Sequence, residues 1–219
     1  MFGLPNIEQY FYSFTTGSVH VQDLEKELRD LRGFLSAHGV VARTAVDVGC
    51  GDGHVTARLR DLLQLDTIHG FEINPRLVEK ARRRGLPIVL ADVLSMTVTG
   101  NFDVAITYGA MHHFRDADPF IAALRRLSRR YVLVVDSTVR TTLLHRFTGA
   151  PWFPLEASPY RIRTVDEIVA AMEASGLRIL GSHTNENANI WHDRSFILGE
   201  RSDADTSQRH EPARYSGSV

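Results

Sequence analysis

Cysteine and long apolar runs are almost missing from this sequence of 219 residues. The single cysteine, Cys50, rules out an intrachain disulfide and leaves no cysteine cluster for a metal ion. No apolar run approaches the ~20 residues that span a bilayer, and the first residues lack the basic segment followed by an apolar one that marks a secretory signal. A net charge of −1 without a basic run gives no indication of nucleic acid or an anionic membrane as partner. We therefore expect a cytoplasmic protein with one main domain and no membrane or nucleic acid as partner. No metal-ligating residues are expected, and whether a metal assists is left open.

Two common phosphate-binding motifs are missing as well. The sequence has no G-x-x-x-x-G-K-[ST], which excludes a P-loop, and its glycine-rich segment lacks the third glycine of the dinucleotide fingerprint G-x-G-x-x-G. Instead, Asp47 is followed by three glycines two apart, between an apolar run and a helical pattern. Glycines at such a strand-to-helix turn bring bare backbone beside a ligand. Glu72 ends the next expected strand, where a carboxylate accepts hydrogen bonds from both ribose hydroxyls, so the pair predicts a nucleoside-containing cofactor.

Strand and helix patterns alternate regularly along the chain. Apolar runs predict seven strands, at residues 44–48, 67–71, 87–91, 102–108, 131–136, 177–184 and 194–200. Helical spacing, prolines in first turns, glycines after last turns and a capping box predict the helices between them, including one over 23–38 and one that begins at Thr164. This order indicates an α/β fold, a Rossmann-like doubly wound, mostly parallel sheet of seven strands with an antiparallel C-terminal hairpin.

The chain divides into three expected parts. Residues 1–43 contain an aromatic stretch and a helix, and we expect them to cover the cofactor or the substrate. Residues 44–200 form the main domain that binds the cofactor. Residues 201–219 are polar and without periodicity, which is typical of a disordered tail.

Five segments in chain order carry a resemblance to a known family: Val46–Gly53, Gly70–Pro75, Ala91–Val93, Phe102–Phe114 and Tyr131–Asp136. They resemble the class I S-adenosylmethionine-dependent methyltransferases of the small-molecule kind, typified by ubiquinone and menaquinone biosynthesis enzymes. The resemblance implies S-adenosyl-L-methionine as cofactor and a small molecule as methyl acceptor. The cofactor-binding residues that it implies are Asp47, Gly49, Cys50, Gly51, Gly53, Glu72, Ile73, Asp92, Val93 and Tyr108. The family's Pro-Gly-Gly turn before the fifth strand is replaced by Ser128-Arg129-Arg130, which we expect to alter only a surface turn.

The resemblance also implies a role for each acidic residue of the cofactor site. Asp47 would hold the glycine turn and the amino end of the cofactor, Glu72 the ribose, and Asp92 the adenine amino group. The alternatives are that Asp47 caps the following helix and that Glu72 is a solvated acid at a strand end. Cys50, inside the glycine loop, is expected to be a small space-filling residue and not a nucleophile.

Methyl transfer requires a base only where the acceptor is a hydroxyl or an ammonium. Histidine titrates near neutral pH, and His112 and His113 follow the fourth strand at the edge where open α/β sheets bind their ligands. Both are therefore candidate catalytic residues, although a His-His pair at this place is common in the family whatever the substrate, so that a structural role is the alternative. Tyr108 and Asp136, at the ends of strands, are further candidates for the base.

Residues 137–163 form a long connection before the last helix. Its aromatic and proline residues make it too apolar for a disordered linker. We expect a short helix over 141–147 and a segment that roofs the acceptor pocket; the alternative is a flap that only covers the sheet. Replacing Trp152 by alanine separates the two, because a roof residue raises the KM for the acceptor whereas plain cover lowers only stability.

Motifs that the sequence lacks exclude some classes of methyl acceptor. The loop after the fourth strand contains neither [DNS]-P-P-[YFW], which marks amino-methylating nucleic-acid enzymes, nor the two glutamates that hold a guanidinium in protein arginine methyltransferases. A small molecule remains, with oxygen, nitrogen or carbon as the methylated atom. Two other classes stay open: a protein that binds S-adenosylmethionine without transferring its methyl group, and an NAD-dependent oxidoreductase. The oligomeric state is left open.

Overall fold

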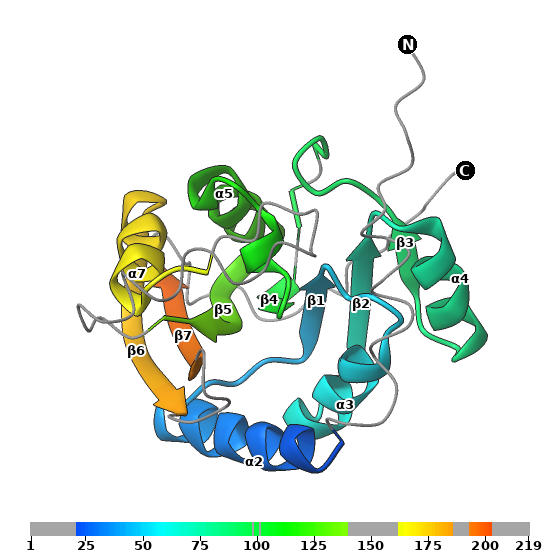
Figure 1. Cartoon of the computed structure of the whole chain (residues 1–219), viewed down its shortest axis with the longest axis horizontal. Coiled ribbons are helices and arrows are strands. Elements are labelled where there is room, and N and C mark those ends of the chain that lie inside the picture. The colour runs from blue at the N-terminus through cyan, green and yellow to red at the C-terminus, as the bar shows by residue number, and fades with distance from the viewer. Residues whose placement is uncertain (1–20, 98, 101, 140–161, 186–192, 203–219) are drawn as a thin grey trace.

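The computed structural model describes residues 21–97, 99–100, 102–139, 162–185 and 193–202 (Figure 1). Within them, seven strands form one sheet in the order β3-β2-β1-β4-β5-β7-β6. The strands are β1 (Thr44–Val48), β2 (Thr67–Glu72), β3 (Ile88–Leu90), β4 (Phe102–Tyr108), β5 (Ser128–Thr138), β6 (Leu177–Asn185) and β7 (Asp193–Arg201). β1 to β5 are parallel, and β7 runs antiparallel to both of its neighbours. The expected α/β sheet with an antiparallel C-terminal hairpin is confirmed.

Helices cover both faces of this sheet (Figure 1). They are α2 (Val21–Ala37), α3 (His54–Leu63), α4 (Pro75–Arg83), α5 (Ala117–Leu127) and α7 (Val165–Ala174), with a 3-10 turn, η1 (Met111–His113). α2 and α3 share one buried cluster with the sheet, whereas α5 and α7 belong to a second cluster on the opposite face. α4 packs near β3 in a third, smaller cluster that includes Cys50. The fold is therefore doubly wound, as expected.

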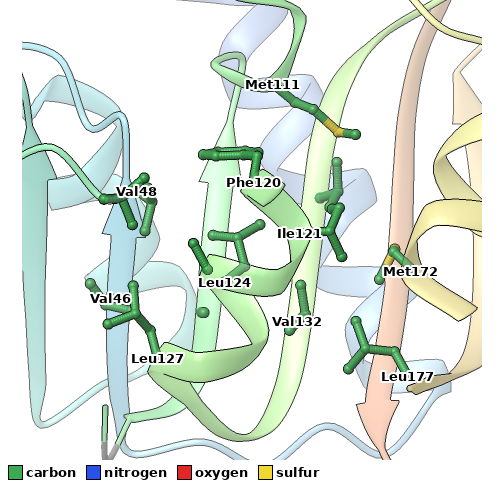
Figure 2. Close-up of a cluster of buried hydrophobic side chains, with 14 of the residues drawn as sticks. Val46, Val48, Met111, Phe120, Ile121, Leu124, Leu127, Val132, Met172 and Leu177 are labelled. Atoms are coloured by element: carbon green, nitrogen blue, oxygen red, sulfur yellow. The ribbon is translucent and has the colours of Figure 1, made fainter. Parts of the chain in front are cut away.

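The cluster under α5 fixes the strands whose carboxyl ends carry the candidate site. Figure 2 shows Phe120, Leu124 and Leu127 of α5 with Val46 of β1 and Val132 of β5. All five side chains are fully buried. Burying an aliphatic or aromatic side chain of this size stabilises a fold by roughly 1.5–3 kcal/mol. With Phe102 and Ala105 of β4 in the same cluster, they hold β1, β4 and β5 at fixed positions relative to one another.

Local signals in the sequence explain where the helices begin. The side chain of Asn74 accepts a hydrogen bond from the N–H of Arg76, and Pro75 occupies the first turn of α4, where its missing N–H costs nothing. Thr164 and Glu167 form the expected capping box of α7, each side chain bonding the other residue's backbone. These signals act within four residues, so the sequence predicts them well.

The segment before the fifth strand differs from the expectation. α5 passes directly into β5, so Ser128-Arg129-Arg130 is the start of the strand and not a surface turn. Ser128 is buried and pairs with Phe102 of β4. The two arginines bond carboxylates on neighbouring strands: Arg129 lies 3.1 Å from an oxygen of Asp103, and Arg130 lies 2.8 Å from one of Glu200. These ion pairs satisfy two charges that a reading of the sequence assigns to solvent.

Several expectations fall on residues outside the described ones. These are the aromatic stretch before residue 21, the helix over 141–147, Trp152 and most of the C-terminal tail. β7 extends through Arg201, one residue into the expected tail, where Arg201 pairs with Leu177. The expectations for residues outside the described ones stay predictions.

Candidate active site

The glycine loop lies between β1 and α3, at the carboxyl edge of the sheet. Gly49, Gly51 and Gly53 all have positive φ, at 76°, 56° and 77°. A Cβ at Gly49 would lie 2.5 Å from the Cβ of Ala110, and one at Gly53 would collide with Leu86, whereas at Gly51 it would meet no atom within 4 Å. The first and last glycines thus allow close packing, and the middle one presents bare backbone to open space.

Glu72 fixes this loop to the end of β2. One of its carboxylate oxygens accepts a hydrogen bond from the N–H of Gly51 at 2.9 Å, and the other accepts from the N–H of Asn74 at 2.8 Å. The side chain is buried, so Glu72 is not the solvated strand-end acid of the alternative interpretation. A carboxylate has about four acceptor positions, so two remain after these bonds.

Asp47 lies buried beneath the loop. Its Oδ2 accepts a 2.6 Å hydrogen bond from the hydroxyl of Thr56 in α3, while its Oδ1 has no hydrogen-bond partner among the described residues. Burial raises the pKa of Asp47 to about 7; the Thr56 hydroxyl opposes the rise and the charge of Glu72 adds to it. The residue at the N-cap of α3 is Gly53, so Asp47 is not the helix cap. It joins β1 to the first turns of α3 and keeps one acceptor available.

Cys50, in the same loop, is buried and points toward Gly70, where an added Cβ would lie 2.6 Å from the Cys50 sulfur. Burial raises the pKa of the thiol well above its usual value, and the negative charges of Asp47 and Glu72 raise it further. A protonated, buried thiol is a poor nucleophile. These properties agree with a small space-filling residue.

Three more of the expected cofactor residues border the ends of β2 and β3. Ile73 is 59% exposed, directly after Glu72. Asp92 is exposed, and its side chain accepts a 3.0 Å hydrogen bond from the N–H of Leu94, which shapes the turn after β3. Val93 is buried in the core beside α5. The segment therefore combines a fixed turn, an anchored aliphatic residue and an exposed carboxylate.

Tyr108 ends β4, and its hydroxyl is already engaged. It donates a 2.5 Å hydrogen bond to Glu27 of α2, and the guanidinium of Arg194 lies 5.0 Å from the centre of its ring. Burial raises the pKa of Tyr108, and the charge of Glu27 raises it further, against the opposing effect of Arg194. A phenol that stays protonated is a poor proton acceptor near neutral pH, which argues against Tyr108 as the base.

His112 and Asp136 form a close pair beside the end of β5. Nδ1 of His112 lies 2.6 Å from Oδ1 of Asp136, and the backbone N–H of His112 donates to Oδ2 of the same carboxylate at 3.1 Å. Burial would raise the pKa of Asp136, but the hydrogen bond from His112, its charge and that of Arg194, and the N–H of Ser137 hold that pKa below its usual value. An ionised carboxylate only accepts, so the Nδ1 of His112 that faces it carries a proton.

His113 differs from its neighbour. Its ring centroid lies 4.3 Å from that of His112. Burial lowers the pKa of His113 to about 4, and the charge of His112 lowers it further, although Asp136 opposes the shift. A histidine that resists protonation is a weak general base. The structure thus separates two candidates that are adjacent in sequence, and the ring of His112 contacts the carboxylate of Asp136.

The comparisons with known proteins match the part of the chain that contains the glycine loop, Glu72 and His112. A family model described as a methyltransferase domain matches residues 45–130. The chain is 29% identical over 157 residues to the ubiquinone biosynthesis O-methyltransferase of Methylococcus capsulatus, covering 58% of this chain and 65% of the relative.

Two further similarities are more restricted. The chain is 31% identical over 84 residues to the tRNA (carboxymethyluridine(34)-5-O)-methyltransferase ALKBH8 of Mus musculus, covering 38% of this chain and 12% of ALKBH8. The chain therefore spans less than two thirds of either relative. The N-methyltransferase NodS of Bradyrhizobium japonicum, solved with S-adenosyl-L-homocysteine, superimposes with a TM-score of 0.68 at 12% identity, over 91% of this chain and 100% of NodS. At that identity, the likeness shows the fold.

The structure adds residues that the sequence alone did not single out. Glu27 of α2 accepts hydrogen bonds from Tyr108 and, at 2.8 Å, from Nε of Arg194 in β7. Arg163 donates to carbonyls of the loop that follows η1. The pairs that join these residues are separated by 48 to 167 positions in the chain, so no local spacing announces them.

Two negative findings concern the described part of the chain. It contains no group of three or more histidine, cysteine, aspartate or glutamate residues placed to hold a metal ion. Among its helices, none has the length and hydropathy of a membrane-spanning segment.

Proposed function

We propose that this protein binds S-adenosylmethionine at the carboxyl edge of the sheet and transfers its methyl group to a small molecule. The glycine loop, tied through Gly51 to the buried carboxylate of Glu72, is the observation that carries the proposal. When bound, the cofactor supplies an electrophilic methyl carbon on its sulfonium. The protein's share is then to bind, orient and exclude water.

The described residues fit such a cofactor. Glu72 keeps two acceptor positions, which suit the two hydroxyls of a ribose. Asp47 presents a buried oxygen that has no hydrogen-bond partner among the described residues, which suits the positive amino group of the cofactor. Asp92 is exposed and would accept from the adenine amino group, with Ile73 and Val93 on either side. Each proposed role thus uses either a hydrogen-bond acceptor or an apolar side chain at this end of the sheet.

His112 would serve as the base, with Asp136 as its partner. The pair fixes the imidazole so that Nε2 accepts a proton from a hydroxyl or an ammonium on the acceptor. Asp136 would then stabilise the charged imidazolium, as a carboxylate does in other histidine pairs. His113, whose pKa lies at about 4, would shape the pocket without taking the proton.

A small-molecule acceptor is supported by the relative in ubiquinone biosynthesis, whereas the tRNA-modifying relative matches over a short segment only. Oxygen, nitrogen and carbon remain the alternatives for the methylated atom. We expect residues 1–43 and 137–163 to cover the cofactor and acceptor above the main domain at 44–200, residues beyond 201 to form a tail, and the protein to act in the cytoplasm.

Calorimetry with S-adenosylmethionine, S-adenosylhomocysteine and NAD tests the cofactor. We expect the first two to bind, and replacement of Glu72 with alanine to weaken both by about 10²–10⁴-fold, because it removes two charged hydrogen bonds of about 1.5–3 kcal/mol each. Glu79→Ala is a matched control, since Glu79 is exposed and bonds only Arg83 in the described contacts. Binding of NAD alone would overturn the proposal and move Glu72 to a dinucleotide ribose.

A further inference from the structure

Arg163 lies just before α7 and joins three parts of the candidate site. Its backbone forms a parallel bridge with Thr138 at the end of β5, and its carbonyl accepts a 3.1 Å hydrogen bond from the N–H of Val139. The next residue, Thr164, caps α7. The backbone of Arg163 is therefore fixed to the strand that carries Asp136 and to the start of a helix.

The side chain of Arg163 reaches from there to the turn that carries His112. Its guanidinium donates to the carbonyls of Met111, Phe114 and Arg115, at 3.3, 2.7 and 2.8 Å. Met111 precedes the two histidines and Phe114 follows them, so the bonds bracket the pair. Only one short 3-10 turn forms this segment, held within itself by the bonds from His113 to Ala110 and from Phe114 to Met111.

Burial of Arg163 raises the energetic cost of losing these hydrogen bonds. Arg163 is 3% exposed, and a buried charge is tolerated only where its donors are satisfied. A guanidinium is a rigid plane with five donors and serves several carbonyls at once, which a lysine ammonium on a flexible stem does not. The geometry therefore needs arginine and not merely a positive charge.

We propose that Arg163 is a positioning residue that holds His112 against Asp136. This inference rests on the proposed function, because that function gives the pair of His112 and Asp136 its catalytic role. His112 meets Asp136 through both its ring and its backbone N–H, and a shift of the turn would break both contacts together. Arg163 fixes the turn to β5, so it joins the two elements that each supply one half of the pair.

The state of the His112 ring tests the proposal without a known acceptor. In the full-length, ¹⁵N-labelled protein, exchange of the Nδ1 proton of His112 with water is measured by NMR, with the signal assigned by its loss in His112→Ala. Arg163→Met is expected to speed this exchange roughly tenfold or more, since it removes charge-assisted bonds from the turn. Arg163→Lys should fall between wild type and the methionine variant.

Arg201→Met is the matched control, because Arg201 also donates to a backbone carbonyl, that of Ser128, at the opposite end of β5. Unchanged exchange in Arg163→Met would overturn the proposal. Where that variant does not fold, wild-type exchange in Arg163→Lys would overturn it. S-adenosylhomocysteine affinity, measured on the same samples, should stay within about twofold in the folded variants. Absence of that binding in wild type would refute the proposed function, whereas the ring exchange would still decide the role of Arg163.

Discussion

Replacing His112 with alanine is expected to lower the rate of methyl transfer by about 10²–10⁴-fold, the usual contribution of a positioned general base. The cofactor would still bind, because His112 makes none of the contacts described for the glycine loop or Glu72. The loss should therefore fall on kcat, with S-adenosylhomocysteine affinity nearly unchanged. The measurement is single-turnover transfer of a labelled methyl group to an acceptor identified from small-molecule extracts.

Asp136→Asn should give a loss of similar size, since an amide no longer holds the proton on Nδ1 and leaves Nε2 without its accepting role. His183→Ala is a suitable control: that histidine is exposed on β6 and bonds Asn185. Near-normal turnover in both His112→Ala and His113→Ala would mean that the base lies elsewhere or that the acceptor needs none.

Replacing Asp47 with asparagine is expected to change how stability depends on pH. The pKa of Asp47 lies at about 7 in the folded protein, above the ordinary value of 3.8, mainly because the carboxyl is buried. The folded protein thus keeps a proton that the unfolded chain releases, so this contribution to stability is full below pH 3.8 and is lost as the pH rises to about 7. Between pH 5 and 8, wild type should lose about 3 kcal/mol of unfolding free energy relative to the variant.

The same substitution removes the loss of stability at high pH but should weaken cofactor binding there. Asparagine cannot supply the negative charge that the cofactor's amino group would meet, so affinity at pH 8 should fall by about 10–100-fold. Denaturant unfolding at several pH values and calorimetry measure the two effects on the same samples.

Asp103→Asn provides the control for the pH effect. Burial would raise the pKa of Asp103, but hydrogen bonds from Arg43 and Thr44 and the charge of Arg129 bring it below the ordinary value. Its contribution is therefore present above pH 3.8 and lost only as the pH falls further, so no slope should arise between pH 5 and 8. A pH-independent difference between wild type and Asp47→Asn would show that Asp47 is ionised throughout.

The fold was predictable wherever the information is local. The bounds of β1 and β4 agree with the predicted strands, because apolar runs end there at glycine or polar residues. The capping box at Thr164 was equally clear. The start of β5 was not, because Arg129 and Arg130 look like a solvated turn until Asp103 and Glu200 come beside them.

The residues of the candidate site likewise fall into those that local sequence predicts and those that depend on distant partners. Asp47, Glu72 and the glycines follow a motif with fixed spacing, so the sequence shows them together. His112 and Asp136 were both candidates for the base, yet only the sheet shows that they bond each other across 24 positions. Nothing local distinguishes His112 from His113, because burial and partners set their difference. Glu27, Arg163 and Arg194 were missed because their partners are distant in the chain.

The position of β7 in the sheet has a consequence for synthesis. β7 is the last of the described strands along the chain, yet it lies between β5 and β6. A nascent chain that has left the ribosome only as far as β6 still shows the edge of β5, an apolar strand with unpaired backbone groups that invites association with other chains. β7 also brings Arg194 to Glu27, and Ser195 to Thr138 at 2.7 Å. Pairing of β7 therefore covers the exposed edge of β5 and completes the surroundings of Asp136 in one late step of folding.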